Sequence, residues 1–190
     1  MNRPCMSVAI ALALLSTPLV AQAGKLPGTM KVAQHELKLN GEGVREKYLL
    51  DLYVAGLYLP ETSRDAQAII AADQLMAIRI AVVSKLVSQE KLVESLDEGF
   101  GKSTKGKLQP IQKQLEQFRR CFAGEIVRGD VFDLIYVPKQ GVFVFKNGKR
   151  TGVVAGMPFK QALFGIWLGE QPADATLRTA LLGAAETTRR

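Results

Sequence analysis

The chain has 190 residues, a formal net charge of +7, one histidine and two cysteines. This length suits a single domain with a sizeable core. So few histidines and cysteines cannot complete a tetrahedral zinc shell, and no metal site or other cofactor is expected. The basic residues between Lys102 and Arg120 lack interleaved aromatic residues. They predict a solvated face and give no sign of nucleic-acid binding.

The first two dozen residues have the features of a secretory signal. Arg3 precedes an apolar stretch, residues 8–15, that is too short to span a bilayer. Ala21-Gln22-Ala23 then has the small-x-small form that signal peptidase accepts. We therefore expect cleavage near Ala23, a single mature domain over residues 24–190, a periplasmic or secreted location, and no stable membrane span. The alternative is an uncleaved N-terminal anchor.

Cysteine and histidine, which act as nucleophile and general base in many enzymes, are scarce in the mature chain. Cys121 would be its sole cysteine, so no internal disulfide can form, and its place beside Phe122 predicts a small buried apolar residue. His35 stands alone at the start of a predicted strand. A Ser-His-Asp arrangement is therefore not expected.

The first half of the mature chain predicts mainly strands. Residues 26–31 have a loop-like composition, and residues 35–39 alternate polar and apolar side chains, which is typical of a half-buried strand. Asn40-Gly41-Glu42-Gly43 predicts a turn. A long extended segment, 44–59, follows; it is apolar on both faces over most of its length, which predicts a central strand covered on both sides. Gly56 is a candidate for a bulge.

The second half alternates helices and strands. The predicted order is strand, two helices, three strands and two helices, over residues 76–83, 88–100, 108–122, 131–137, 141–145, 151–155, 158–167 and 173–182. Ser88 is the predicted N-cap of the first helix, and Asn147-Gly148 is the strongest hairpin signal. The element order predicts an α+β domain, with a large antiparallel β-sheet and a layer of helices packed on it.

Arg45 is the strongest candidate for a functional residue. Burying a guanidinium beside an apolar strand is costly without an anionic partner, and its planar fork suits a carboxylate or phenolate oxygen. One interpretation is structural: Arg45 pairs with an internal acid such as Asp51 or Glu46, or lies in solvent. The other is functional: Arg45 binds the acidic head of an organic molecule whose tail lies among apolar side chains.

Four stretches together resemble a known family. They are Gly-x-Gly-Val-Arg at 41–45, Ala-Gly-Leu-Tyr-Leu at 55–59, Gln-Phe-Arg at 117–119, and Ala-Leu-Phe-Gly-Ile-Trp-Leu-Gly at 162–169. In order and spacing they resemble the chalcone isomerase superfamily, specifically its bacterial chalcone isomerase-like branch, over nearly all the mature chain. The resemblance implies a large antiparallel sheet with helices packed across it and a ligand cleft between the layers.

The same resemblance nominates the site residues. Arg45 matches the arginine that holds the substrate oxyanion in the plant enzymes, and Tyr53 stands where those enzymes have a threonine. Their catalytic tyrosine and asparagine would fall within residues 100–114, which contain neither. A further hydroxyl residue of those enzymes corresponds to a position at or near Ala162, where this chain has no hydroxyl. The resemblance therefore predicts no catalytic residue. Other members bind fatty acids through an arginine and a tyrosine, so Arg45 with Tyr53, or with Tyr58, is the predicted ligand site.

The leading hypothesis is a periplasmic, non-catalytic protein that binds a small amphipathic or fatty acid between sheet and helices. The alternatives are an isomerase or lyase acting on a phenolic, chalcone-like ligand, with Arg45 stabilising the oxyanion, and a partner-binding scaffold without a pocket ligand. A straight strand would separate Arg45 from Tyr53 by about 26 Å. They can share a ligand only if the chain folds back between them, for example at Glu46-Lys47. The sequence leaves the oligomeric state open.

Overall fold

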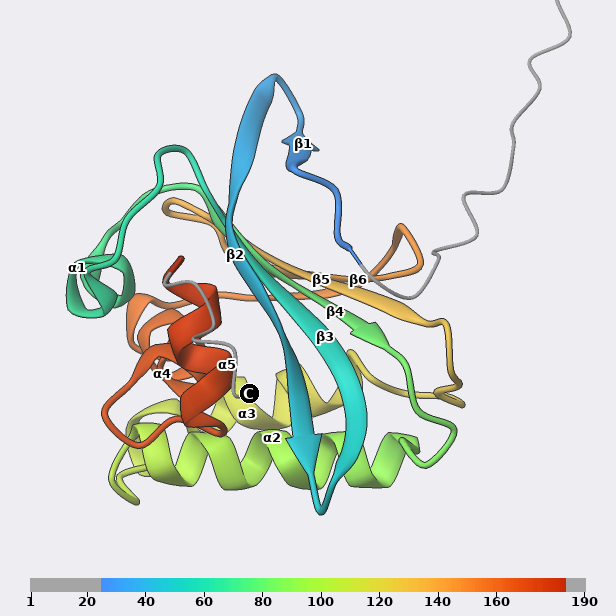
Figure 1. Ribbon diagram of the computed structural model, residues 1–190. Coiled ribbons are helices and arrows are strands. Elements are labelled where there is room, and N and C mark those ends of the chain that lie inside the picture. Colours follow the sequence, from blue (N-terminus) through green and yellow to red (C-terminus); the bar gives the residue numbers. More distant parts are fainter. Residues whose placement is uncertain (1–24, 184–190) are drawn as a thin grey trace, which may run out of the picture.

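The computed structural model describes residues 25–183, so the predicted signal sequence and its cleavage site lie outside the described residues. A seven-stranded antiparallel sheet is built from consecutive strands that pair with their neighbours in chain order (Figure 1). The strands are β1 (Thr29–Val32), β2 (His35–Lys47), β3 (Leu50–Leu59), β4 (Met76–Val82), β5 (Val131–Val137), β6 (Gly141–Lys146) and β7 (Lys149–Val154). The predicted α+β class with a large antiparallel sheet is confirmed.

Helices cover one face of this sheet (Figure 1). They are α1 (Ala66–Ala71), α2 (Gln89–Ser103), the short 3-10 helix η1 (Gln109–Ile111), α3 (Gln112–Arg120), α4 (Met157–Leu168) and α5 (Ala175–Leu181). The main core lies between the sheet and this layer, where Leu57 of β3 packs in one cluster with Phe100 and Leu163. Within residues 25–183, no helix combines the length and the apolar character needed to cross a membrane.

The opposite face of the sheet has a smaller core of its own. It contains Leu37 and Tyr58, together with Met30 of β1. The segment before β1 lies over this face, since a Cβ added to Gly56 would lie 2.5 Å from Leu26 Cδ1. Strand β3 is therefore covered on both sides, as its two apolar faces predicted.

The hairpin of β2 and β3 differs from the sequence-based expectation. The turn predicted at residues 40–43 and the single extended segment predicted over 44–59 are both wrong: β2 runs through the first, and the chain reverses at Tyr48-Leu49. Gly41 and Gly43 serve helix packing, because a Cβ on Gly41 would collide with the Ala180 carbonyl of α5. These glycines allow α5 to lie directly on β2.

The two irregularities in the β2–β3 pairing also lie away from the predicted position. They fall between Leu39 and Gly41 and between Arg45 and Glu46, so the bulge expected at Gly56 is absent from this pair of described strands. Gly56 is instead a point of close approach for the segment that precedes β1.

Local signals predict the second half of the chain well. Ser88 caps α2 by accepting a hydrogen bond from the Lys91 amide, and Asn147 and Gly148 form the β6–β7 turn with φ of 52° and 78°. Two short elements were not predicted: β1, placed in a stretch expected to be a loop, and α1. Helix α1 ends against the buried Lys160, whose Nζ donates 2.8 Å hydrogen bonds to the carbonyls of Ile69, Ile70 and Ala72.

Candidate functional site

The β2–β3 hairpin brings Arg45 and Tyr53 together. They are direct partners in the strand register, so both side chains point to the helix-covered face. The chain folds back at Tyr48-Leu49, just beyond the Glu46-Lys47 position suggested by the sequence. The 26 Å separation of a straight strand is thereby removed, and the two residues can face one ligand.

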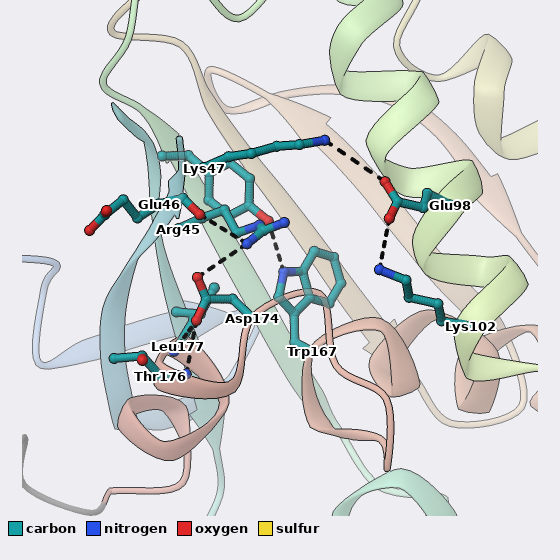
Figure 2. A network of polar contacts seen from close by, with 10 residues as sticks. Arg45, Glu46, Lys47, Glu98, Lys102, Trp167, Asp174, Thr176 and Leu177 are labelled. Carbon is teal, nitrogen blue, oxygen red and sulfur yellow. Dashed lines mark hydrogen bonds and ion pairs between the residues drawn. The ribbon is translucent and has the colours of Figure 1, made fainter. Parts of the chain in front are cut away.

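Arg45 is only partly satisfied by the protein (Figure 2). Its Nη1 donates to Asp174 Oδ2 at 3.1 Å and to the Glu46 carbonyl oxygen at 3.0 Å. Its Nε is buried and has no hydrogen-bond partner within residues 25–183. Asp174 therefore takes the place of Asp51 or the Glu46 carboxylate, the acids expected in the structural interpretation, and the buried Nε donor is left unused.

Asp174 is held in place by the helix that it caps. Its Oδ1 accepts hydrogen bonds from the backbone amides of Thr176 and Leu177, at 2.8 and 3.0 Å, at the start of α5 (Figure 2). Oδ2 of the same carboxylate then faces Arg45. Asp174 thus links the start of α5 to the Arg45 guanidinium. It fixes the orientation of the guanidinium and occupies one guanidinium nitrogen.

Tyr53 provides a neutral hydroxyl beside this guanidinium. Its oxygen accepts a 3.1 Å hydrogen bond from Trp167 Nε1 of α4. Burial raises the pKa of Tyr53, and the hydrogen bond from Trp167 and the charge of Arg45 only partly offset this effect. The phenol therefore keeps its proton at neutral pH, and no acceptor for that proton is found in the described part of the chain.

A pocket of about 310 Å³ opens next to Tyr53, between the β2–β3 hairpin and α2. Its wall is largely apolar and includes Leu50, Leu52, Tyr53, Val87 and Leu92. Charged side chains of both signs stand around it, namely Lys47, Lys91, Glu94 and Glu98. Arg45 does not line the pocket itself; its strand partner Tyr53 does.

A larger depression, about 780 Å³, lies between the start of α2 and residues 124–128. Its wall consists mostly of polar and charged side chains with Val87, Ile126 and Val127, and it includes neither Arg45 nor Tyr53. Because ligand sites combine an apolar wall with a few placed polar groups, the smaller pocket is the better candidate.

The structure does not bring Tyr58 to Arg45. Tyr58 points to the opposite face of the sheet, where its hydroxyl donates to the Pro27 carbonyl at 2.9 Å. Burial raises the pKa of Tyr58 to about 12. Its ring lies 6.0 Å from the Arg79 guanidinium, which forms a two-contact ion pair with Asp133.

Two residues at the candidate site escaped the sequence analysis, Asp174 and Trp167. Trp167 lay in a family-like stretch, but nothing local linked its indole to Tyr53. Asp174 is the second residue of the helix predicted over 173–182, and the structure begins α5 just after it, with Asp174 as the N-cap. Aspartate is a usual N-cap residue, so this role could have been inferred. Its pairing with Arg45, 129 residues away, could not be inferred.

The remaining candidates from the sequence lie elsewhere. His35 is exposed at the start of β2, and Cys121 is buried at the end of α3. Burial raises the pKa of the Cys121 thiol, which disfavours the reactive thiolate. The basic residues between Lys102 and Arg120 are exposed to solvent, as the sequence predicted.

Comparison with known proteins identifies the family and a solved structure of similar fold. Residues 20–183 match a family model described as chalcone isomerase-like. The crystal structure of a fatty-acid binding protein from Arabidopsis thaliana has a similar fold, with a TM-score of 0.65 and 21% sequence identity over 83% of this chain and 90% of that one. A search of curated proteins gives no significant match. The match over most of the sequence shows that the chain belongs to the chalcone isomerase-like family.

Proposed function

We propose that this protein is a non-catalytic carrier of a small amphipathic acid, and of a fatty acid in particular. The observation that carries this proposal is a pair of unused donors. The hydroxyl of Tyr53, which lines an apolar pocket, and the buried Nε of its direct strand partner Arg45 have no acceptor in residues 25–183. The pocket next to Tyr53 measures about 310 Å³. A carboxylate supplies the acceptors, and an alkyl chain fills the space.

Charge and hydrogen bonding favour an ionised head group at this position. Hydrogen bonds from a guanidinium or a phenol to a carboxylate are charge-assisted and stronger than neutral ones. Asp174 takes only one guanidinium nitrogen and holds Arg45 in place, so it orients the site without saturating it. Because burial keeps Tyr53 protonated, its hydroxyl remains a donor.

The apolar wall favours an alkyl chain over a compact phenolic ligand. Leu50, Leu52 and Leu92 line the pocket together with Tyr53. Each buried methylene contributes about 0.8 kcal/mol. A volume of about 310 Å³ is near the lower end of the range for ligand sites, roughly 300–1,000 Å³, which favours a short or medium chain. The fatty-acid binding protein of similar fold supports the same ligand class.

The pocket wall supports binding without chemistry. Residues 100–114, where the plant enzymes carry a catalytic tyrosine and asparagine, contain neither and contribute nothing to the wall. Ala162 stands near the position of a further family hydroxyl. Arg45 and Tyr53 therefore lack the polar partners that the family's enzymes use for catalysis.

Native mass spectrometry of freshly purified protein tests the proposal. We expect a co-purified or titratable acid, with affinity rising about fourfold for each added methylene from octanoate upward until the pocket is full. Arg45→Ala and Tyr53→Phe should weaken binding, whereas Tyr58→Phe, on the opposite face, should not. Absence of acid binding by the wild-type protein contradicts the proposal, and so does a chalcone absorbance decay faster than in buffer.

We also propose that the protein acts after export, in the periplasm or outside the cell. The support is the sequence of residues 1–23, with its short apolar stretch and small-x-small ending. The intact mass of the protein from a periplasmic fraction should match a chain that begins at Gly24. Full-length protein confined to the cytoplasm would contradict this location.

A further inference from the structure

The turn between β2 and β3 has an unusual composition. Tyr48 and Leu49 are 87% and 90% exposed, and their φ angles are 54° and 63°. Two-residue hairpin turns of this shape favour Asn-Gly, because large side chains are strained at positive φ. The β6–β7 turn of the same sheet uses Asn147-Gly148. The Tyr-Leu pair is therefore unfavourable both in conformation and in exposure, and such an outlier suggests a function.

The surroundings of this turn continue its apolar character. We define the apolar tip as Tyr48, Leu49, Leu50 and Leu86; the last two are 47% and 51% exposed. Tyr48, Leu50 and Leu86 also line the candidate pocket, so the tip forms part of its mouth. The β2–β3 turn lies at the lower edge of the molecule in Figure 1, at the far end of the hairpin.

We propose that the apolar tip docks the protein onto an anionic lipid bilayer, with the pocket mouth at the membrane surface. A two-residue convex turn supplies far less area than the roughly 1,200–2,000 Å² that a stable protein interface buries, but it suits insertion among lipid head groups. Tyrosine is favoured at that interface because its ring is apolar and its hydroxyl polar.

Lysines near the apolar tip also favour an anionic bilayer. Lys47 adjoins the turn and lies 3.9 Å from Glu98, Lys85 adjoins Leu86, and both lysines are exposed. The whole chain has a formal net charge of +7. A lysine near an anionic surface strengthens binding about fivefold. Glu46 and Asp51 form the next residue pair behind the tip and are exposed. These two carboxylates limit the depth of insertion to the turn itself.

The docking proposal goes beyond ligand binding and stands without it. If the pocket holds a fatty acid, docking places the mouth of the pocket at the bilayer, where fatty acids are dissolved. The acid then exchanges between bilayer and pocket without crossing bulk water.

Vesicle flotation tests the docking. The wild-type protein should bind vesicles of equal parts phosphatidylcholine and phosphatidylglycerol, and bind pure phosphatidylcholine vesicles several-fold more weakly. The double substitution Tyr48→Asn, Leu49→Gly copies the β6–β7 turn, so it removes the apolar side chains while relieving strain. It should lower vesicle binding at least about tenfold without loss of thermal stability.

A lysine pair supplies the matched charge control. Lys47→Gln should weaken binding to the anionic vesicles about fivefold, whereas Lys31→Gln, an exposed change on β1 at the other end of the sheet, should have no effect. Equal losses for both variants would show attraction by net charge alone and would overturn the assignment to the tip.

Three other outcomes would also overturn the proposal. The first is wild-type protein that ignores anionic vesicles. The second is a Tyr48→Asn, Leu49→Gly variant that binds them unchanged. The third is vesicle-free self-association that the same variant abolishes, which would assign the tip to a second copy of the chain. Dodecanoate titration without vesicles reports on the pocket separately, so failure of docking and failure of ligand binding remain distinguishable.

Discussion

Arg45 and Arg79 each pair with an aspartate, on opposite faces of the same sheet, and the two pairs are built differently. Arg79 on β4 meets Asp133 directly across the strand pair, with contacts of 2.6 and 2.9 Å. Arg45 on β2 meets Asp174 from a distant helix with one contact of 3.1 Å, and its Nε is left without a partner among residues 25–183.

This difference separates an ion pair in which both ends of the guanidinium fork are occupied from one that leaves a guanidinium donor free. A carboxylate that takes both ends of a guanidinium fork leaves little for a ligand to bind. A carboxylate that takes one nitrogen fixes the orientation of the side chain and leaves other donors free. Only the Arg45 pair has a pocket-lining tyrosine, Tyr53, as its direct strand neighbour.

The largest expected effect is on stability, from Arg79→Ala. Removing one partner of a half-buried, two-contact pair leaves the Asp133 charge uncompensated, which costs about 3 kcal/mol of unfolding free energy. Chemical denaturation measures the loss, and adding Asp133→Ala should restore part of it. Dodecanoate affinity should not change, because the Arg79–Asp133 pair lies on the opposite face of the sheet. A large loss of affinity in the folded variant would contradict the assignment of ligand binding to the Arg45 pair alone.

Arg45→Ala should show the reverse pattern. We expect dodecanoate affinity to fall about 10- to 100-fold, since hydrogen bonds to a charged group contribute about 1.5–3 kcal/mol. Stability should fall by only about 1 kcal/mol, because Asp174 retains its two amide hydrogen bonds at the start of α5. Isothermal titration and denaturation give the two values. Arg45→Lys, which keeps the charge and loses the fork, should lie between.

The tyrosines form a smaller, matched pair of tests. Tyr53→Phe removes the proposed donor to the ligand and should weaken dodecanoate binding about tenfold. Tyr58→Phe removes a hydroxyl of the same kind, bonded to the Pro27 carbonyl on the other face, and should leave affinity unchanged. Equal losses for the two variants would argue that the effect comes from general destabilisation.

The smallest expected effect is the response to alkaline pH. Burial raises the pKa of Tyr53 above its ordinary value near 10, so dodecanoate affinity should stay constant from pH about 7 to about 9.5. Above pH about 10 the folded protein holds a proton that the unfolded chain releases, so stability should decline as pH rises. The decline should be shallower in Tyr53→Phe. An affinity that drops near pH 8 would contradict the protonated donor.

The sequence predicted elements well where their signals are local. Ser88 and the Asn147-Gly148 turn are local signals, and the elements that they mark lie where they were expected. The β2–β3 hairpin has the opposite character: its turn consists of Tyr48 and Leu49, which carry no turn signal. The glycines at 41 and 43, which do carry one, are required by the close approach of α5.

The candidate site was predicted only in part, because some of its contacts depend on tertiary packing and leave no local signal. Family resemblance selected Arg45 and Tyr53, and the hairpin makes them neighbours. Strand alternation already separated Tyr53 from Tyr58, because residues five apart on one strand point to opposite faces. Asp174 enters through tertiary packing of α5 on β2, which no local pattern reports.

The proposed function depends above all on Arg45 binding the carboxylate of the acid. Carbon-13 NMR of dodecanoate labelled at its carboxyl carbon, titrated with acid while bound, tests this claim directly. If Arg45 binds the carboxylate, the bound carboxyl should keep its charge to a lower pH than it does in an Arg45→Ala complex formed at saturating ligand. An identical carboxyl titration in the two complexes would contradict it.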